Sequence, residues 1–129
     1  MTPNHALFRR IFAISKVGVD TYDYLPDAKS AYPFVYLGEN NGSETPNNDI
    51  FGTLRQTVHL YGLREDRAGL DDISAYLENE VKRVHDGYNY HLHHTSTSKQ
   101  IIPDNTDVQP LLHIVLDFTF DYTKTKKEK

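Results

Sequence analysis

The sequence contains no cysteine among its 129 residues. Disulfide bonds, thiolate metal ligands and cysteine nucleophiles are therefore excluded, and nothing indicates an oxidising compartment. Long apolar runs are also missing, because no stretch approaches the roughly 20 apolar residues that span a bilayer. The first residues carry no signal pattern, since Arg9 and Arg10 lie inside an amphipathic segment with no small-residue cleavage site after it. These absences favour a chain that is made and kept in a cytoplasm.

Positive charge is scarce outside the end of the chain. The formal net charge is −4, and the isoelectric point is about 5.9. A protein that grips nucleic acid usually shows a clear basic face, which this balance does not favour. The only dense basic run is formed by four lysines, Lys124, Lys126, Lys127 and Lys129. We expect residues 124–129 to be a flexible basic tail, because termini without apolar residues are rarely held in place.

The length and composition indicate one modest core. A chain of 129 residues falls in the range of a single domain. The apolar fraction is 38%, below the roughly 45–50% of typical domains. Part of the shortfall is local, because polar residues crowd into two internal segments and the tail. We expect residues 1–123 to form a single α+β domain.

Two segments show the periodicity of amphipathic helices. Within residues 4–17, apolar side chains recur every three to four positions, after a start signal at Thr2 and Pro3. A second apolar stripe runs through residues 69–85, with acidic residues at its beginning and basic residues at its end. Each segment is therefore predicted to be a helix with one buried face.

Four segments have the pattern of strands, and two long polar segments separate them. The predicted strands are residues 32–37, 53–63, 89–95 and 111–122, the last with the clearest alternation. Residues 38–52 and 96–109 are rich in polar residues, and we expect a long loop and a linker there. The order of elements predicts an α+β fold. Its sheet would be antiparallel or mixed, with about four strands and two helices packed on one face.

Histidines are the strongest candidates for a metal site. His91 and His93 would share one face of a strand, as some zinc sites require, and His59 or His113 could supply a third ligand if their strands are adjacent. The alternative is a set of ordinary surface histidines on a polar sheet face. No nucleophile-elbow or phosphate-loop motif occurs. We therefore expect no catalytic residue, no cofactor, no metal and no enzymatic activity.

Four apolar residues in polar surroundings are candidates for subunit or partner contacts. Ile50 and Phe51 form an apolar pair near the end of the long polar segment, where they could bind a partner surface. Leu111 and Val115 lie on the otherwise polar side of the last predicted strand. An unpaired apolar position on such a face is typical of a contact between subunits.

Three parts of the sequence together resemble a known family. They are residues 22–26 followed by 32–39, the segment 52–61, and the amphipathic helix with the β-rich half after it. In this order they resemble the tail terminators, or tail-completion (tail-to-head joining) proteins, of siphophages that infect Gram-positive bacteria. The resemblance covers most of residues 20–84 and, more loosely, the remainder. It rests on structural motifs, and the family supplies no catalytic residue to carry over.

The resemblance implies a structural role in a virion. The subunit would form a hexameric ring at the head-proximal end of the tail, after assembly in the host cytoplasm. Its partners would be further copies of itself, the major tail tube protein and a head-completion or connector protein. DNA would pass through without specific binding, and no membrane would be involved.

Three other readings remain open. The chain could form another ring of the neck, such as a head-completion protein. It could be a small metal-dependent enzyme that uses His91 and His93. It could also be a monomeric binding module that uses the polar segment 38–52.

Overall fold

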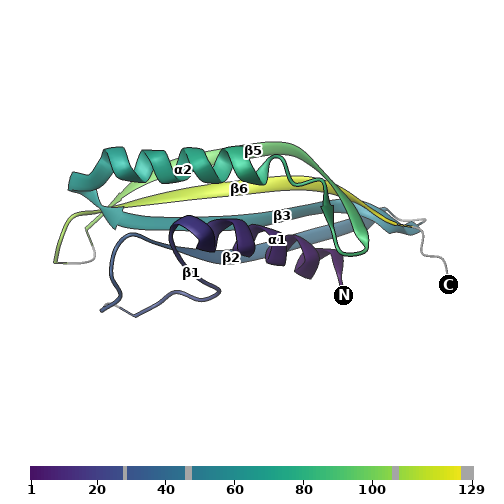
Figure 1. Ribbon diagram of the computed structural model, residues 1–129, viewed down its shortest axis with the longest axis horizontal. Coiled ribbons are helices and arrows are strands. Elements are labelled where there is room, and N and C mark those ends of the chain that lie inside the picture. The colour runs from purple at the N-terminus through teal and green to yellow at the C-terminus, as the bar shows by residue number, and fades with distance from the viewer. Residues whose placement is uncertain (28, 46–47, 106–107, 126–129) are drawn as a thin grey trace.

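A computed structural model describes residues 1–27, 29–45, 48–105 and 108–125, without the side chains of residues 44, 45 and 48–50. In chain order its elements are α1 (Pro3–Gly18), β1 (Asp20–Tyr22), β2 (Phe34–Thr45), β3 (Asn48–Leu63), the 3-10 helix η1 (Arg64–Asp66), α2 (Arg67–Val81), β4 (Asp86–Gly87), β5 (Tyr90–Asp104) and β6 (Leu111–Lys124). The molecule is elongated, and its long strands run along the long axis (Figure 1).

The strands form one mixed sheet in the order β1-β2-β3-β6-β5-β4. Strand β1 runs parallel to β2, and every other neighbouring pair is antiparallel. The sheet is curled into a half-barrel, and about 50% of the chain is strand. The expectation of a sheet of about four strands is therefore wrong. The two additional strands, β1 and β4, are three and two residues long, too short to leave a periodic pattern.

The two polar segments are also not the loop and linker that we expected. Residues 38–45 and 48–52 continue β2 and β3 as a long hairpin, and residues 96–104 continue β5 alongside β6. Cross-strand hydrogen bonds join backbone groups, which every residue other than proline carries as donor and acceptor. Asn-, Ser- and Thr-rich stretches can therefore pair with a neighbouring strand without any alternation of apolar side chains.

Both predicted helices are present, but both boundaries of α2 are shifted, and it begins at Arg67 instead of Gly69. Helix α1 begins as expected, because the Thr2 hydroxyl oxygen accepts a hydrogen bond from the His5 N–H at 3.1 Å. Helix α2 ends at Val81, before the predicted end at His85. The carbonyl of His85 instead accepts a hydrogen bond from the N–H of Leu92 at 3.0 Å. The segment after α2 therefore pairs with the start of β5. No helix in the described ranges is both long and apolar enough to cross a membrane.

The core lies between one face of the sheet and the two helices. Alternate residues of β3 and β6, together with the first residues of β2 and β5, point toward α1 and α2 and are almost fully buried. The largest fully buried apolar side chains are Leu7, Ile11, Leu54, Leu60, Leu70, Leu77, Leu112, Leu116, Phe118 and Phe120. The clear alternation of β6 follows from this arrangement, because β6 is a central strand with one face in the core.

The first two residues of the predicted basic tail are held by the sheet and by a backbone hydrogen bond. Lys124 is the last residue of β6, and the Thr125 N–H donates to the carbonyl of Asn89 at 2.8 Å. Residues 126–129 of the predicted tail lie outside the described residues.

Candidate functional site

The face of the sheet that the helices leave uncovered carries a group of aromatic and imidazole rings. We call this group the aromatic cluster. Its members come from the residues just before and at the start of β2 and from the paired segments of β3 and β6; they are Tyr32, Phe34, Tyr36, His59, Tyr61 and His113. The register explains the grouping, because Phe34 lies opposite Tyr61, Tyr36 opposite His59, and Tyr61 opposite His113. Cross-strand aromatic pairs of this kind stabilise a sheet face.

Two histidines form the centre of the aromatic cluster. The Nδ1 atom of His59 lies 2.8 Å from the Nε2 atom of His113. The ring of Tyr36 stacks on His59 with centroids 4.5 Å apart, and Tyr61 stacks on His113 with centroids 4.1 Å apart. His59 is only 8% exposed although its face of the sheet has no helix over it. The stacked tyrosines thus bury His59, whereas His113 is half-buried.

A carboxylate extends this pair into a hydrogen-bonded chain. Oε1 of Glu39 lies 3.1 Å from Nε2 of His59, so Nε2 of His59 carries the proton and donates to the carboxylate. In this tautomer, Nδ1 of His59 accepts from the Nε2–H of His113. The hydrogen bond to His59 lowers the pKa of Glu39, and burial together with the neighbouring His59 lowers the pKa of His113. Both shifts favour the arrangement with ionised Glu39 and neutral His113.

A β-bulge in β2 positions Glu39 beside His59. The pairing of β2 with β3 shifts between Leu37 and Asn40, which places Gly38 and Glu39 in the bulge. A side chain at Gly38 would not fit, because its Cβ would lie 2.9 Å from the ring of His59. Glycine at this position therefore allows the imidazole to lie directly against the backbone.

Gln56, the polar residue that interrupts the core face of β3, forms hydrogen bonds with polar groups of the same bulge from the core side of the sheet. Gln56 is 0% exposed. Its amide Nε2 donates to the carbonyls of Thr57 at 2.9 Å and of Glu39 at 3.3 Å, and its Oε1 accepts from Asn40 at 2.6 Å. Asn40 in turn accepts from the amide of Asn4 on α1 at 2.6 Å. This buried network ties the bulge to the first turn of α1.

The histidines considered as candidate zinc ligands are not brought together. His91 and His93 are exposed near the start of β5, where His93 lies opposite Asp121. His113 lies on β6 opposite Ile102, and Ile102 is near the end of β5 that is distant from His91 and His93. Over the described ranges, no group of three or more potential ligand side chains could hold a metal ion. The histidines that do meet are His59 and His113, and their ring nitrogens bond to each other and to Glu39.

The four predicted contact residues lie at three levels along the sheet. Phe51 is at the hairpin end of β3, opposite Thr123, and its side chain is 40% exposed. Ile50 precedes it in β3, and its side chain lies outside the described part of the structure. Leu111 begins β6 at the opposite end of the molecule and is 3% exposed, while Val115 is half-buried beside His59. The two hairpin residues are thus far from the two β6 residues.

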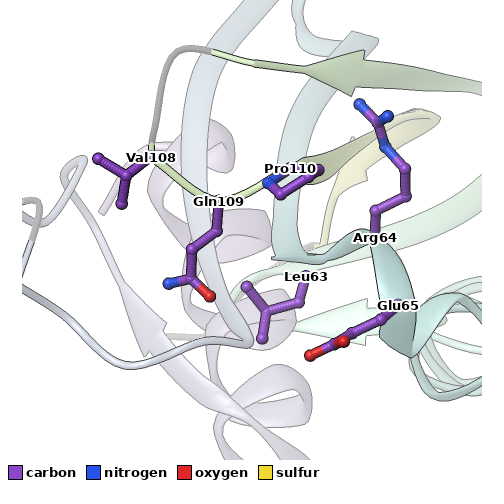
Figure 2. A pocket seen from close by; sticks show the side chains of 6 residues that line it. All are labelled: Leu63, Arg64, Glu65, Val108, Gln109 and Pro110. Atoms are coloured by element: carbon purple, nitrogen blue, oxygen red, sulfur yellow. The ribbon is translucent and has the colours of Figure 1, made fainter.

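Leu111 lies next to a shallow pocket at the end of the molecule, which we call the end pocket. It is lined by Leu63, Arg64, Glu65, Val108, Gln109 and Pro110. In Figure 2 the side chain of Leu63 lies between those of Gln109 and Glu65, while the side chain of Arg64 points away from them. The N–H of Arg64 donates to the carbonyl of Pro110 at 3.0 Å, which joins η1 to the start of β6. Val108 is 96% exposed at the rim.

Sequence reasoning missed the aromatic cluster. The alternation of the predicted strands 53–63 and 111–122 already placed His59 and His113 on the polar side of their strands. Their contact depends on the register between β3 and β6, which pairs Tyr61 with His113. The available signal was the alternation of aromatic residues in 32–36 and of His59 with Tyr61, and its use required knowing that these strands are neighbours.

Comparisons with known proteins give a likeness among solved structures. No protein-family model matches the chain, and no curated protein matches it either. Among solved structures, the chain is similar to a chain from the "Virion of native gene transfer agent (GTA) particle". The TM-score is 0.64, and the match covers 94% of this chain and 94% of that chain at 14% sequence identity. The likeness shows that the two chains share a fold over nearly their whole lengths.

Proposed function

We propose that this chain is a non-enzymatic structural protein of a phage-like virion. The observation that carries the proposal is the end-to-end likeness to a chain of a gene transfer agent virion, which leaves little of either chain unmatched. The sequence resemblance to siphophage tail-completion proteins points independently to the same kind of particle. Folds are shared between functions, so the proposal also rests on that agreement.

Within this class, we propose the role of a tail terminator. Copies of the chain would form a hexameric ring that caps the head-proximal end of the tail tube, stops tube growth and joins the tail to the head. The net charge of −4 suits a ring through which DNA passes without being held. A closed ring repeats one heterologous contact, so each subunit needs two different lateral surfaces as well as surfaces for tube and head.

The elongated shape offers separate places for these contacts. One end carries Phe51 and Ile50 on the β2–β3 hairpin, and the other carries Leu111 beside the end pocket (Figure 1). We assign the two ends to the axial partners, the tail tube protein and the head-completion protein. Val115 and the aromatic cluster lie between them, on the face without helices.

The test is a capping assay with polymerisation-competent tail tube protein. Absolute mass is first measured by light scattering after size exclusion, for the chain alone and with tube protein added. A terminator gives rings at tube ends, seen by electron microscopy, and tubes that stop growing. A chain that neither caps tubes nor slows their growth contradicts the proposal. Rings that bind head connectors but ignore tubes would instead indicate a head-completion protein.

A further inference from the structure

An apolar groove lies between the first turns of α2 and the neighbouring ends of β5 and β6. We call it the α2 groove. It has a volume of about 480 Å³ and is lined by Arg67, Ala68, Asp71, Ile101, Leu112 and Ile114. Ile101 is 46% exposed, so aliphatic surface remains open to solvent along one side of the groove. An apolar side chain of moderate size would remove this surface from water.

One side of the α2 groove is acidic. Asp71 lines it, and Asp72 is exposed one residue further along α2. Neither carboxylate forms an ion pair with any residue in the described part of the chain. Arg67 is the one basic residue among the groove's lining residues. A basic group beside an apolar side chain would therefore complement the Asp71 side of the groove.

The last turn of α1 presents such a pair on the other side of α2. Val17 is 78% exposed, and Lys16 beside it is exposed and forms no ion pair with the described residues. We call these two residues the α1 knob. Helix α1 contains no acidic residue, so nothing on the helix itself neutralises Lys16.

The α1 knob and the α2 groove face different directions. The hydroxyl of Tyr76 on α2 donates to the carbonyl of Ile14 at 3.2 Å, and the Tyr76 ring lies near Gly18. The last turn of α1 therefore packs on the Tyr76 side of α2. Ala68 and Asp71 lie on the side of α2 toward β5, well around the helix from Tyr76. One copy cannot fill its own groove with its own knob across the body of α2.

We propose that the α1 knob of one copy occupies the α2 groove of the next copy. Val17 enters the apolar groove, and Lys16 faces Asp71. The two surfaces differ and lie on opposite sides of α2, so the contact is heterologous and repeats from copy to copy, as a ring requires. The inference rests on the proposed ring, and it names the lateral surfaces of that ring.

Cross-linking tests the contact directly, because the natural chain has no cysteine. Val17→Cys and Ala68→Cys are made in separate chains, mixed and oxidised, both free in concentrated solution and bound at tube ends. We expect a disulfide-linked dimer from the mixture and none from either variant alone. The matched control replaces Ala68→Cys by Ala75→Cys, exposed on α2 about 10 Å further along the helix. This control should not cross-link to Val17→Cys, because a disulfide needs Cα atoms within about 7 Å.

Charge reversal provides a second test that does not depend on a disulfide. Lys16→Glu and Asp71→Lys should each weaken self-association about threefold to fivefold, as expected for a partly exposed ion pair. A one-to-one mixture of the two variants should regain association, since every knob then meets a groove of opposite charge. A mixture that associates no better than the single variants contradicts the inference.

The outcomes for the ring contact and for the proposed function can be separated. A Val17–Ala68 cross-link without tube capping supports the contact and contradicts the terminator role. Capping without this cross-link supports the role and overturns the contact. A Val17–Val17 cross-link, which reports a symmetric dimer, also overturns it, as does the absence of any cross-link in both settings.

Discussion

The Nδ1 atom of His59 on β3 lies 2.8 Å from the Nε2 atom of His113 on β6, with a tyrosine ring stacked on each imidazole. A single proton lies in the hydrogen bond between the two rings. Because Glu39 accepts from Nε2 of His59, His113 is the donor and His59 the acceptor. Protonating both imidazoles would place two N–H groups and two positive charges against each other. The pair is therefore sensitive to acid.

We predict that stability falls as the pH drops below about 6.5. Burial lowers the pKa of His113 from its ordinary value of 6.5, so the unfolded chain binds this proton more tightly than the folded chain. By linkage, the contribution of His113 to the free energy of unfolding is complete above pH 6.5. It is lost as the pH falls from that value through the lower pKa of the folded state. Urea unfolding at about pH 7.5 and about pH 5.5 measures the difference. The lowered pKa of Glu39 acts in a separate window, below its ordinary value of 4.5.

The variant His113→Phe should reduce this pH dependence, since phenylalanine keeps the stacking surface but does not titrate. His91→Phe is the matched control, because His91 is exposed away from the aromatic cluster. An unchanged pH dependence in His113→Phe, or an equal reduction in His91→Phe, would show that the pair is not the sensitive element.

Replacing Gln56 by leucine should destabilise the protein by about 1–3 kcal/mol, although leucine is apolar and similar in size. Gln56 donates to the carbonyls of Thr57 and Glu39, and these groups and Asn40 would lose buried partners. Urea unfolding provides the measurement. Arg55→Leu, one position earlier on the exposed face of β3, is the control and should change stability by less than about 0.5 kcal/mol. A Gln56→Leu variant as stable as the natural protein would contradict the role assigned to the network.

Gly62→Ala should also destabilise, by about 1–3 kcal/mol, through overpacking. A Cβ at this position would lie 2.3 Å from Cδ2 of Leu70, where α2 packs on β3. Gly18→Ala is the control, because its Cβ would meet Tyr76 at an ordinary distance of 3.8 Å.

A double-mutant cycle distinguishes a direct clash from a general weakening of α2. If the clash is with Leu70, Gly62→Ala combined with Leu70→Ala should lose less stability than the sum of the two single changes. Additive losses would argue against a direct clash.

Phe51→Ser should separate assembly from folding. The Phe51 side chain is 40% exposed at the hairpin end of β3, so we expect unfolding to change by no more than about 0.5 kcal/mol. If this end meets a partner, the variant should cap tubes less well at equal protein concentration. Tyr88→Ser removes another exposed aromatic side chain, one that packs with Arg9 on the α1 side. It should cap normally, and a loss of capping in both variants would remove the hairpin end from the proposal.

The sequence determined the helices and strands in which apolar side chains recur at regular intervals. The apolar stripe of residues 4–17 predicted α1, and the alternation of residues 111–122 predicted β6, because each has one face in the core and one outside it. The start of α1 could also be read locally, since Thr2 binds a backbone N–H only three residues away. In each case the physical cause lies within a short stretch of chain.

Only the tertiary structure decided the extent of the sheet and the composition of its uncovered face. Residues 38–45 and 96–104 are strands because β3 and β6 offer them backbone partners, and a backbone ladder leaves no mark in a polar sequence. Gln56 looked like an interruption of the core until the bulge at Gly38 and Glu39 supplied its partners. His59 and His113 meet because the β3–β6 register places them together, although they are distant in the sequence. A chain pattern records which way a side chain points, whereas the identity of its neighbour is set by the pairing of strands.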